Sequence, residues 1–411
     1  MTEKAAPSRR LVVQKFGGTS VATPEGRAAV RARVRASVTG GADVVVVVSA
    51  MGREGAPYAT DTLLGLLREG PADPREADML SSCGEVIAAV VLAHELRADG
   101  VDAVAMTGAQ AGVRTDGEFG GATVLGVEPA ALCAAISEGR VPVVAGFQGA
   151  SPSGETTTLG RGGSDTTACA IGSALHADVV EIHTDVDGVM SADPRACADA
   201  RVLDSLQFEE LFQMARAGAK VMHAPAAEIA MSAGVPVRVL NAAGSAAGTL
   251  VADAATLAGG LEPRVATAVS HSDGVTRFVV TLPGGEGRTA ALTAAFRAMA
   301  DSGVSLDMFT PLDDRLAFSV DSPQADQAAA LLSSLGLSCD RRDGLAKVTL
   351  VGAGMHGIPG VMARVAEALA ADGIDILQSA DSHYTISVLV AADDLHRAVG
   401  SLHREFRLGV Q

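Results

Sequence analysis

A lysine followed directly by two glycines is the first feature of this sequence that could do chemistry. The motif Lys15-Phe16-Gly17-Gly18-Thr19-Ser20 ends a short apolar run, residues 11–15, and precedes a predicted helix. Ligands of open α/β sheets bind at this edge, where glycine N–H groups can approach phosphate oxygens. Lys15 could then reach a phosphoryl group in transfer. Because the lysine precedes the glycines, this is not a GxxxxGK[ST] phosphate loop, and a plain tight turn remains an alternative.

A second glycine-rich segment, residues 159–167, surrounds an arginine. Its sequence is LGRGGSDTT, and a helix is predicted to begin within it. Glycines before a helix start favour an anion site, and Arg161 could grip a carboxylate through two hydrogen bonds. Asp165 could orient Lys15 or help to place Mg²⁺. A capped helix N-terminus, with Ser164 or Asp165 as the cap, explains the same residues and does not exclude function.

A third segment, residues 184–195, has the composition of an irregular loop after a predicted strand. Its sequence TDVDGVMSADPR departs from the EF-hand calcium spacing and lacks the closing glutamate of that motif. A nucleotide-holding loop and a plain turn both remain open. Lys220, in the sequence GAKVMH, is unremarkable when considered alone.

The elements that must position these residues alternate between strand and helix. Apolar runs predict strands at 11–15, 43–49, 101–106, 141–146, 178–184 and 235–240, and helical periodicity predicts helices at 24–38, 75–99, 129–138, 163–175, 207–217 and 223–233. Continuous apolar strands in this alternation indicate an α/β fold with a mainly parallel sheet sandwiched by helices. Residues 242–262 are rich in alanine and glycine and mark a domain boundary.

The last third of the chain repeats an α+β unit of roughly 70 residues. The order strand, helix, strand, strand, helix occurs at 275–335 and again at 345–405. Residues 265–271 form a spare strand, which we expect to complete the second copy, so that the first copy is inserted into the second. The predicted organisation is a tail at 1–10, a large α/β domain at 11–252 that carries the three motifs, a linker at 253–263, an inserted module at 273–344, and a second module formed by 264–272 and 345–411.

Composition argues against several classes of function. The 411 residues include 48 acidic and 32 basic side chains, and a net charge of −16 would repel nucleic acid. The five cysteines form neither a CxxC pair nor a Cys/His cluster, so we expect no disulfide framework and no metal site. The N-terminus lacks the apolar stretch of a secretory signal, and the longest apolar runs are too short for a membrane span. We therefore expect a cytoplasmic protein with neither a membrane nor a nucleic-acid partner.

In this combination and order, KFGGTS, GRGGSD, TDVDGVMSADPR and GAKVMH resemble the signature segments of the aspartate kinases, and the resemblance covers essentially the whole chain after residue 10. The C-terminal repeat resembles paired ACT domains, ferredoxin-like βαββαβ modules that bind amino acids. The resemblance implies the amino acid kinase fold and transfer of the γ-phosphoryl group of ATP, with nucleotide-bound Mg²⁺, to L-aspartate. It also implies a homo-oligomer formed through the ACT domains and feedback control by lysine, threonine or diaminopimelate.

The resemblance further implies roles for individual residues. Lys15, supported by Asp165, would be catalytic, while Glu85 would pair with the amino group of aspartate and Arg161 with a carboxylate. The other implied residues are, for ATP, Phe16, Gly17, Gly18, Ser49, Ser164, Thr184, Asp185, Val189, Met190, Ser191, Ala192, Asp193, Pro194, Arg195 and Lys220; for aspartate, Ser49, Thr60, Gly162, Gly163 and Ser164; and for the effector, Asp307, Met308, His356, Ile358, Pro359, Gly360, Gln378 and Ser379.

Two other functions remain open. One is a kinase of the same fold that acts on glutamate, acetylglutamate, carbamate or a nucleoside monophosphate, and the other is an amino-acid sensor without catalysis. Retention of Lys15, Arg161 and Asp165 together argues against the sensor, and the tandem repeat argues against the other kinases. Gly121 stands where relatives often carry a polar residue, which is a departure from the family pattern.

Overall fold

The structure is a computed structural model that describes residues 9–67, 70–219, 222–244, 246–257, 265–285, 287–355 and 357–409. The chain forms two compact units. The first comprises the described chain up to Val189, the segment Val202–Ala215 and residues 222–257, and the second comprises Met190–Arg201, Arg216–Ala219 and the described residues from 265 onward. Lys220 and His356, two predicted site residues, lie outside the described residues, as do residues 258–263 of the predicted linker.

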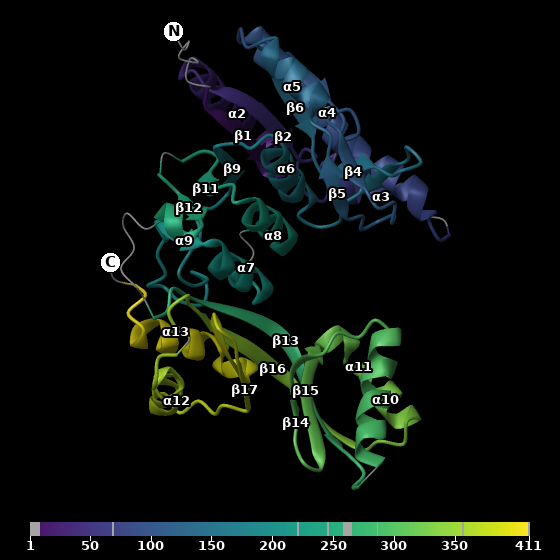
Figure 1. The fold of residues 1–411 in the computed structure, drawn as a ribbon, viewed down its shortest axis with the longest axis vertical. Coiled ribbons are helices and arrows are strands. Elements are labelled where there is room, and N and C mark those ends of the chain that lie inside the picture. The colour runs from purple at the N-terminus through teal and green to yellow at the C-terminus, as the bar shows by residue number, and fades with distance from the viewer. Residues whose placement is uncertain are drawn as a thin grey trace, which may run out of the picture. The chain divides into compact units, whose positions relative to one another are not determined.

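The first unit is built on an eight-stranded sheet in the order β10-β12-β11-β9-β1-β2-β6-β3 (Figure 1). Its strands are β1 Leu11–Phe16, β2 Asp43–Val48, β3 Ala103–Met106, β6 Val141–Ala145, β9 Val179–Thr184, β10 Ser205–Gln207, β11 Val237–Asn241 and β12 Thr249–Ala252. The six strands from β11 to β3 in this order are parallel. β12 pairs antiparallel with β11, and β10 pairs parallel with β12. The predicted mainly parallel sheet is confirmed.

Two groups of helices cover this sheet. On one face, α2 (Pro24–Thr39) and α4 (Pro74–Ala98) share a core with the alternate valines Val44, Val46 and Val48 of β2. α6 (Gly163–Ala174) packs against β1, β2 and β9, and against α8 (Ala224–Ala233). Burial of both faces explains why β2 is a continuous run of valines. The remaining helices of the unit are α1 Gly18–Ala22, α3 Thr60–Leu64, α5 Ala130–Ser137, α7 Phe208–Arg216 and α9 Ala254–Leu257.

The starts of α2 and α4 follow from local sequence. Each helix begins with a proline, whose missing N–H costs nothing in the first turn. Thr23 caps α2 by accepting a hydrogen bond from Gly26 N at 3.1 Å, and Asp73 caps α4 by accepting one from Arg75 N at 2.9 Å. Among the described residues, α4 is the one helix long and apolar enough to span a membrane, and half of that stretch is buried inside the unit.

A second, smaller sheet lies beside the first and was not predicted. Its order is β5-β4-β7-β8, with strands β4 Val113–Thr115, β5 Val124–Val127, β7 Gln148–Ala150 and β8 Thr156–Thr158. Strands of three or four residues are too short to show a period in the sequence. This sheet matters for function because its loops carry residues 119–122 and lead into the arginine-containing segment at 159–167.

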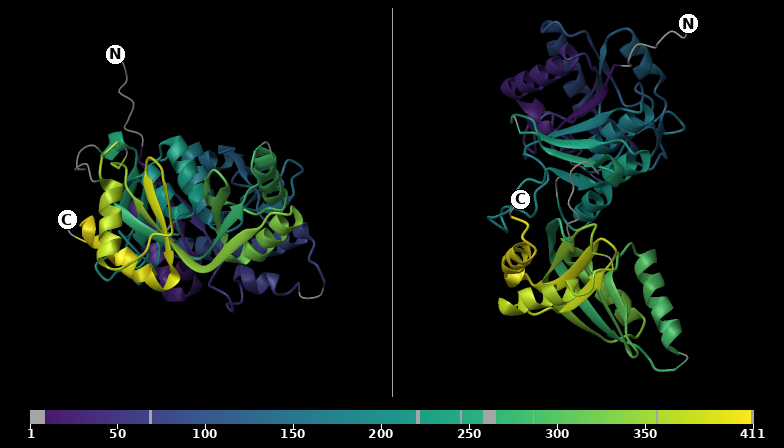
Figure 2. Two further views of the ribbon diagram at one scale, coloured as in Figure 1. Left: turned by 90° about the horizontal axis from the view of Figure 1, so that it is seen from below. Right: turned by 60° about the vertical axis from the view of Figure 1, so that its left-hand side comes forward.

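The second unit is a six-stranded sheet in the order β14-β15-β13-β16-β18-β17. Its strands are β13 Ala268–Thr281, β14 Asp307–Pro311, β15 Arg315–Asp321, β16 Cys339–Val351, β17 Gln378–Asp381 and β18 Thr385–Ala391, and its helices are α10 Gly287–Asp301, α11 Ala325–Ser334, α12 Val361–Ala371 and α13 Leu395–Glu405, with short 3₁₀ turns at Ser322–Gln324 and Ala392–Asp394. Figures 1 and 2 show α10 and α11 against one end of this sheet and α12 and α13 against the other. Each helix pair closes its own apolar core.

The long strands β13 and β16 belong to both repeats. Ala268–Ser272 pairs with the stretch Lys347–Val351, whereas residues 275–281 pair with β15. The insertion of the first copy into the second stays a prediction. Two strands were predicted at 265–271 and 275–282, but the structure has one strand with a register shift between Ser272 and Val275. Gly274, with φ 66°, supplies the left-handed backbone that lets the strand bulge instead of ending.

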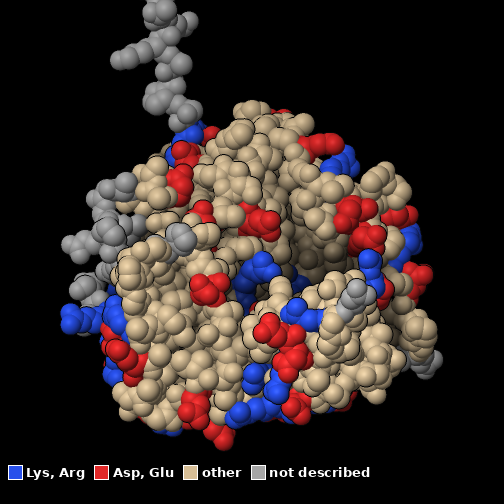
Figure 3. Space-filling model, turned by 60° about the horizontal axis from the view of Figure 1, so that its bottom comes forward, with Lys and Arg blue, Asp and Glu red and all other residues tan. Residues whose placement is uncertain are grey.

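On the face shown in Figure 3, acidic and basic side chains of the described residues are intermixed. Many are joined in ion pairs, such as Arg341 with Asp326 and Asp343 on the surface of the second unit. Surface pairs of this kind contribute only about 0–1 kcal/mol each. Their main effect is to reduce the electrostatic repulsion expected from a net charge of −16, and their contribution to the stability of the fold is small.

Candidate active site

An ion pair at the carboxyl edge of the parallel sheet brings together the first two motifs. Lys15, in β1, places its Nζ 2.7 Å from Oδ1 of Asp165, in the first turn of α6. Both side chains are only 12% exposed. Near the start of α6 the backbone dipole also favours a negative group, so Asp165 is a suitable partner for the lysine. A cation held at this edge is well placed to meet the phosphates of a nucleotide.

The glycines of the first motif allow two loops to touch through their backbones. A Cβ on Gly18 would lie 2.5 Å from the carbonyl oxygen of Ala50, a distance that real Cβ atoms do not reach. The loops after β1 and β2 are tied by hydrogen bonds from Ser49 N to Phe16 O at 3.2 Å and from Gly52 N to Gly18 O at 3.0 Å. A Cβ on Gly17 would make only ordinary van der Waals contact, 3.7 Å from Nζ of Lys15, so close packing requires glycine at position 18 and not at position 17.

Glu85 is the buried carboxylate of the site. It lies on α4 with 3% of its surface exposed, and its Oε1 accepts a hydrogen bond from Ala50 N at 2.9 Å. Its Oε2 has no partner among the described residues. Burial raises the pKa of Glu85 to about 7, although the bond from Ala50 N opposes the rise. A buried carboxylate with a free oxygen is prepared to receive a cationic group.

Close packing brings α4 to this position. A Cβ on Gly84 would lie 2.8 Å from both the side chain of Ala50 and the carbonyl of Tyr58. The glycine therefore lets the helix press against the loop after β2, which carries Glu85 to the neighbourhood of Ser49. Thr60 begins α3, which packs against the same helix α4.

The arginine-containing segment forms the entry to α6. Gly160 and Gly162 both adopt φ 68°, and Gly162 precedes the first residue of the helix. A Cβ on Gly162 would also lie 2.3 Å from the side chain of His223, so glycine is required twice over. Ser164 is buried against Gly146, whereas Arg161 is exposed. The guanidinium is thus available to a ligand while the rest of the segment is fixed.

The predicted nucleotide segment 184–195 is divided between the two units. Thr184, Asp185 and Val189 belong to the first unit, where Asp185 forms an ion pair with Arg53 at 2.8 Å. Residues from Met190 to Arg195 belong to the second unit. There Asp193 accepts hydrogen bonds from Arg195, which lower the pKa of its carboxyl to about 2.

One positioning residue could not be predicted from the sequence. Asp78, on α4, is 2% exposed and accepts hydrogen bonds from Gly120 N, Thr158 N and Thr158 Oγ1 at 2.7–3.0 Å. It joins the loop at 119–122 to the strand that leads into the arginine segment. The sequence gives no signal for it, because α4 carries several other charged residues and the partners of Asp78 lie 42 and 80 residues away.

The described histidines take structural places where their environment is defined. His183, on β9, is 1% exposed, stacks on Phe16 with ring centroids 4.5 Å apart, and contacts Glu181 at 3.2 Å. Burial lowers its pKa, so the ring is neutral near pH 7. No group of three His, Cys, Asp or Glu side chains that could hold a metal ion occurs among the described residues.

Some of the predicted effector residues lie together. Gln378 accepts a hydrogen bond from Arg277 at 3.1 Å and donates one to the carbonyl of Met308, and Asp307 pairs with Lys347. These contacts link β14 and β17, the two ends of the six-stranded sheet. Ile358, Pro359 and Gly360 instead precede α12, where Gly360 adopts φ 90° as the N-cap. No contact joins them to Gln378 among the described residues.

Comparison with known protein families shows the class of protein to which this chain belongs. Residues 10–241 match the amino acid kinase family, and residues 340–404 match the ACT domain. Because the first match spans more than half of the chain, this is a protein of the amino acid kinase class.

Relatives of full length narrow the assignment. The chain is 43% identical to Aspartokinase 1 of Bacillus subtilis (strain 168), over 97% of this chain and 99% of the relative, and 42% identical to Aspartokinase of Mycolicibacterium smegmatis, over 97% and 96%. The structure of Escherichia coli aspartokinase III in complex with aspartate and ADP superposes with a TM-score of 0.79 at 27% identity, over 96% of this chain and 99% of that chain. The chain belongs to the aspartokinases. The predicted family and fold class are confirmed.

Proposed function

We propose that this chain transfers the γ-phosphoryl group of ATP to the β-carboxylate of L-aspartate and forms 4-phospho-L-aspartate, the first step toward the amino acids derived from aspartate. The observation that carries the proposal lies at the carboxyl edge of the sheet, where Lys15 pairs with Asp165 and the buried Glu85 binds Ala50 N in the loop after β2. Membership of the aspartokinases supports it, as does the E. coli relative whose structure contains aspartate and ADP.

In this proposal the protein contributes position and charge. The attacking carboxylate is already ionised at neutral pH, so the reaction needs no general base. Lys15 Nζ neutralises charge on the phosphoryl group, and Asp165 holds the lysine in place. Gly18 lies where the loops after β1 and β2 are in contact, whereas the N–H of Gly17 donates to His183 O at 3.4 Å. Together these groups align donor and acceptor for in-line transfer.

Aspartate is a zwitterion with a second carboxylate, and the site offers a partner for each charge. The free oxygen of Glu85 receives the ammonium group, which replaces the solvation that burial removed. Arg161 binds a carboxylate in a two-bond fork. Thr60, Ser49 and the backbone at Gly162 and Gly163 complete the proposed pocket. This arrangement favours a free α-amino acid over acetylglutamate, whose nitrogen is not charged.

The nucleotide is proposed to lie along residues 184–195, with Lys220 toward its phosphates. Mg²⁺ would enter with ATP, since that ion takes most of its ligands from phosphates and water and one or two from carboxylates. Asp165 offers such a carboxylate beside Lys15. When bound, the ion neutralises phosphate charge.

Regulation is proposed to act through the ACT repeat. Asp307, Met308, Gln378 and Ser379 lie on the strands β14 and β17, and Phe309 on β14 is 58% exposed. An exposed aromatic on a terminal strand suits pairing with a second copy, so we propose a homo-oligomer. Lysine, threonine and diaminopimelate are the proposed effectors, and the structure of an E. coli relative in complex with lysine and aspartate supports the first. The proposed location is the cytoplasm, where ATP and aspartate are present.

The test is ADP release with Mg·ATP and one acceptor at a time: L-aspartate, L-glutamate, N-acetylglutamate or carbamate. The proposal expects turnover with aspartate alone, suppressed by one of the three effectors. Turnover with another acceptor would indicate a different kinase of this fold. Binding of amino acids without any turnover would indicate the sensor.

A further inference from the structure

The segment proposed to hold ATP leaves the first unit abruptly. Val189 is anchored there by hydrogen bonds from its N to Thr249 Oγ1 and from Leu203 N to its carbonyl, both 2.8 Å. Two residues later, Ser191 is fully buried in the second unit. The position of residues 190–195 is therefore determined by what holds Ser191.

Ser191 is held by its backbone and by its side chain. Its N donates to Arg201 O and its carbonyl accepts from Val269 N, both at 2.8 Å, while its Oγ accepts from Arg201 N at 3.0 Å. Its Oγ also lies 2.9 Å from Nε2 of His403, on α13. Through this contact the Ser191 side chain is bound to helix α13 of the ACT repeat.

His403 is suited to a fixed and uncharged role. It is 1% exposed, and burial lowers its pKa, with Arg201 acting in the same direction and Asp199 opposing it. A neutral imidazole has one donor and one acceptor nitrogen, so it can complete the hydrogen bonding of a buried hydroxyl. No other histidine on α13 is buried: His396 is exposed.

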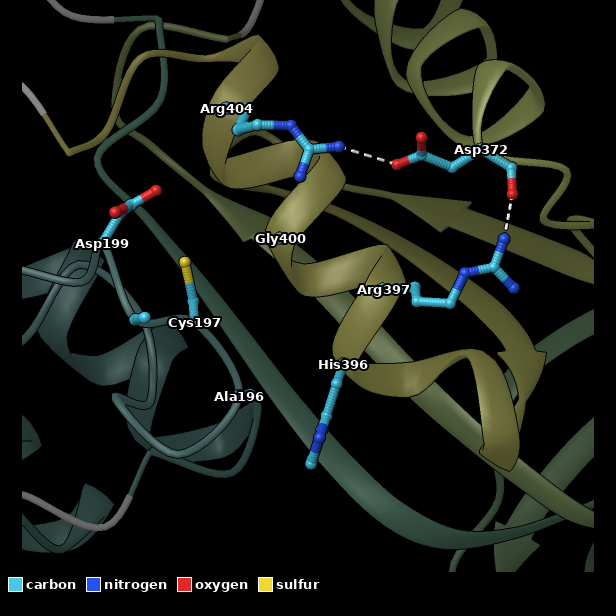
Figure 4. Close-up of a pocket in the computed structure, with 9 residues that line it drawn as sticks. Ala196, Cys197, Asp199, Asp372, His396, Arg397, Gly400 and Arg404 are labelled. Atoms are coloured by element: carbon cyan, nitrogen blue, oxygen red, sulfur yellow. Dashed lines mark hydrogen bonds and ion pairs between the residues drawn. The ribbon is translucent and has the colours of Figure 1, made fainter.

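Packing around this bond shows that the segment is built into the second unit. Ala192 and Cys197 are members of the apolar core that includes Val399 and Leu402 of α13. Figure 4 shows the Cys197 side chain directed toward α13 beside Gly400. Arg201 Nε donates to the carbonyl of Leu408, just beyond the helix, at 2.8 Å. The segment is thus attached to α13 at several points along its length.

We infer that His403 is a positioning residue for ATP: through Ser191 it sets the path of residues 190–195, so that the second ACT copy adjusts the affinity for the nucleotide. The inference rests on the proposed assignment of residues 184–195 to ATP. His403 does not touch the reacting atoms in this account. It therefore affects binding of ATP and leaves binding of aspartate unchanged.

Four variants test the inference by steady-state kinetics. His403→Leu removes the side-chain bond and is expected to raise KM for ATP about fivefold, a typical size for coupling between sites, with kcat and KM for aspartate within twofold of the unmodified enzyme. Ser191→Ala removes the same bond together with the bond from Arg201 N, and it is expected to raise KM for ATP at least as much. The double variant is expected to match Ser191→Ala, because that change alone already removes the bond to His403. His403→Gln, whose amide can occupy the position of Nε2, is expected to restore KM for ATP.

Ser401→Ala is the matched control. Ser401 lies on the same helix, is 4% exposed, and donates a 2.8 Å hydrogen bond to Ala368 O within the ACT repeat. Loss of that bond is expected to lower the unfolding temperature without changing KM for ATP. If Leu at 403 prevents folding, Ser191→Ala, which removes one oxygen, carries the test.

The outcomes separate the inference from the proposed function. Unchanged KM for ATP in Ser191→Ala, with aspartate turnover intact, would overturn the positioning role. An equal rise in Ser401→Ala would do the same, because it would show general loosening of the repeat. If the unmodified enzyme shows no aspartate-dependent turnover, the proposed function fails and the ATP assignment fails with it.

Discussion

Lys15 and Asp165 lie 150 residues apart in the sequence, by the difference of their numbers, yet their charged atoms are 2.7 Å apart at the carboxyl edge of the sheet. The pair joins the strand that carries the first glycine motif to the helix that begins within the second. Neither motif makes a complete site alone. The fold places Asp165 beside Lys15, and the ion pair fixes the orientation of the lysine side chain.

Replacement of Lys15 by alanine should remove the cation that faces the phosphoryl group. We expect kcat to fall about 10²–10³-fold, as for loss of one preorganised electrostatic donor, with a smaller fall for Asp165→Asn. Steady-state ADP release measures this. The control is Arg31→Ala, which breaks a partly buried ion pair with Glu95 and Asp99 away from the site. If Lys15→Ala retained full kcat, the lysine would have no part in transfer.

Glu85→Gln should separate aspartate binding from stability. Gln keeps the acceptor for Ala50 N but cannot pair with the ammonium group, so KM for aspartate should rise about 100-fold. In the unmodified enzyme KM should rise as pH falls below about 7, the pKa of Glu85, because the carboxyl then becomes neutral. In the variant this dependence should be absent. A KM profile that is the same in both proteins would contradict the assignment.

The same substitution should stabilise the free protein at high pH. The folded-state pKa of Glu85 is raised above its usual value, so the folded state binds the proton more tightly than the unfolded state. Burial of the charge therefore costs nothing below about pH 4.5, costs more as pH rises to 7, and stays at its full value of about 3 kcal/mol above that. Urea unfolding of Glu85→Gln at pH 8 should show most of this gain, and at pH 4.5 little of it.

Gly18→Ala should disturb the contact between the two loops. The new Cβ would meet the carbonyl oxygen of Ala50 at 2.5 Å, and the backbone must move apart to accept it. We expect a loss of about 1–3 kcal/mol in the free energy of unfolding, together with a clear loss of kcat. Gly126→Ala, in the same unit with open space at its Cβ, is the control. Equal behaviour of the two variants would show that the close approach is unimportant.

Asp78→Asn should weaken aspartate binding indirectly. Its amide group would face backbone N–H donors at Gly120 and Thr158 that now meet a carboxylate oxygen. We expect about 2 kcal/mol of destabilisation and a higher KM for aspartate, because the loop at 119–122 and the arginine segment lose their common anchor. Thermal unfolding and KM measured on the same preparation check both effects. An unchanged KM would limit Asp78 to stability.

Short-range patterns account for what could be predicted. The alternation of strands and helices could be predicted from continuous valine runs and from prolines at the first position of helices. The placement of Lys15 at a strand end could be predicted from the residues next to it in the sequence. Asp78 could not be found because its function is defined by partners in another sheet. The strands of that sheet, three or four residues long, left no periodic signal.

Contacts between residues far apart in the chain also could not be predicted from the sequence. Residues 184–195 were interpreted as one loop, but the structure divides them between two units. This division depends on the hydrogen-bond partners of Ser191, one of which is a histidine 212 positions away in the sequence. The spare strand was predicted to end at residue 271, but β13 continues through Asp273 and Gly274 to Thr281. Because β16 pairs along nearly the whole length of β13, the ladder absorbs those residues as a bulge.

The central claim is that a carboxyl group of L-aspartate receives the phosphoryl group at the Lys15 edge. The direct measurement is hydroxylamine trapping of the acyl phosphate formed from Mg·ATP and L-aspartate, with the hydroxamate identified by mass spectrometry. The account predicts aspartate β-hydroxamate in amounts equal to the ADP released, and its loss in Lys15→Ala. ADP release without hydroxamate, or equal hydroxamate from the variant, would contradict it.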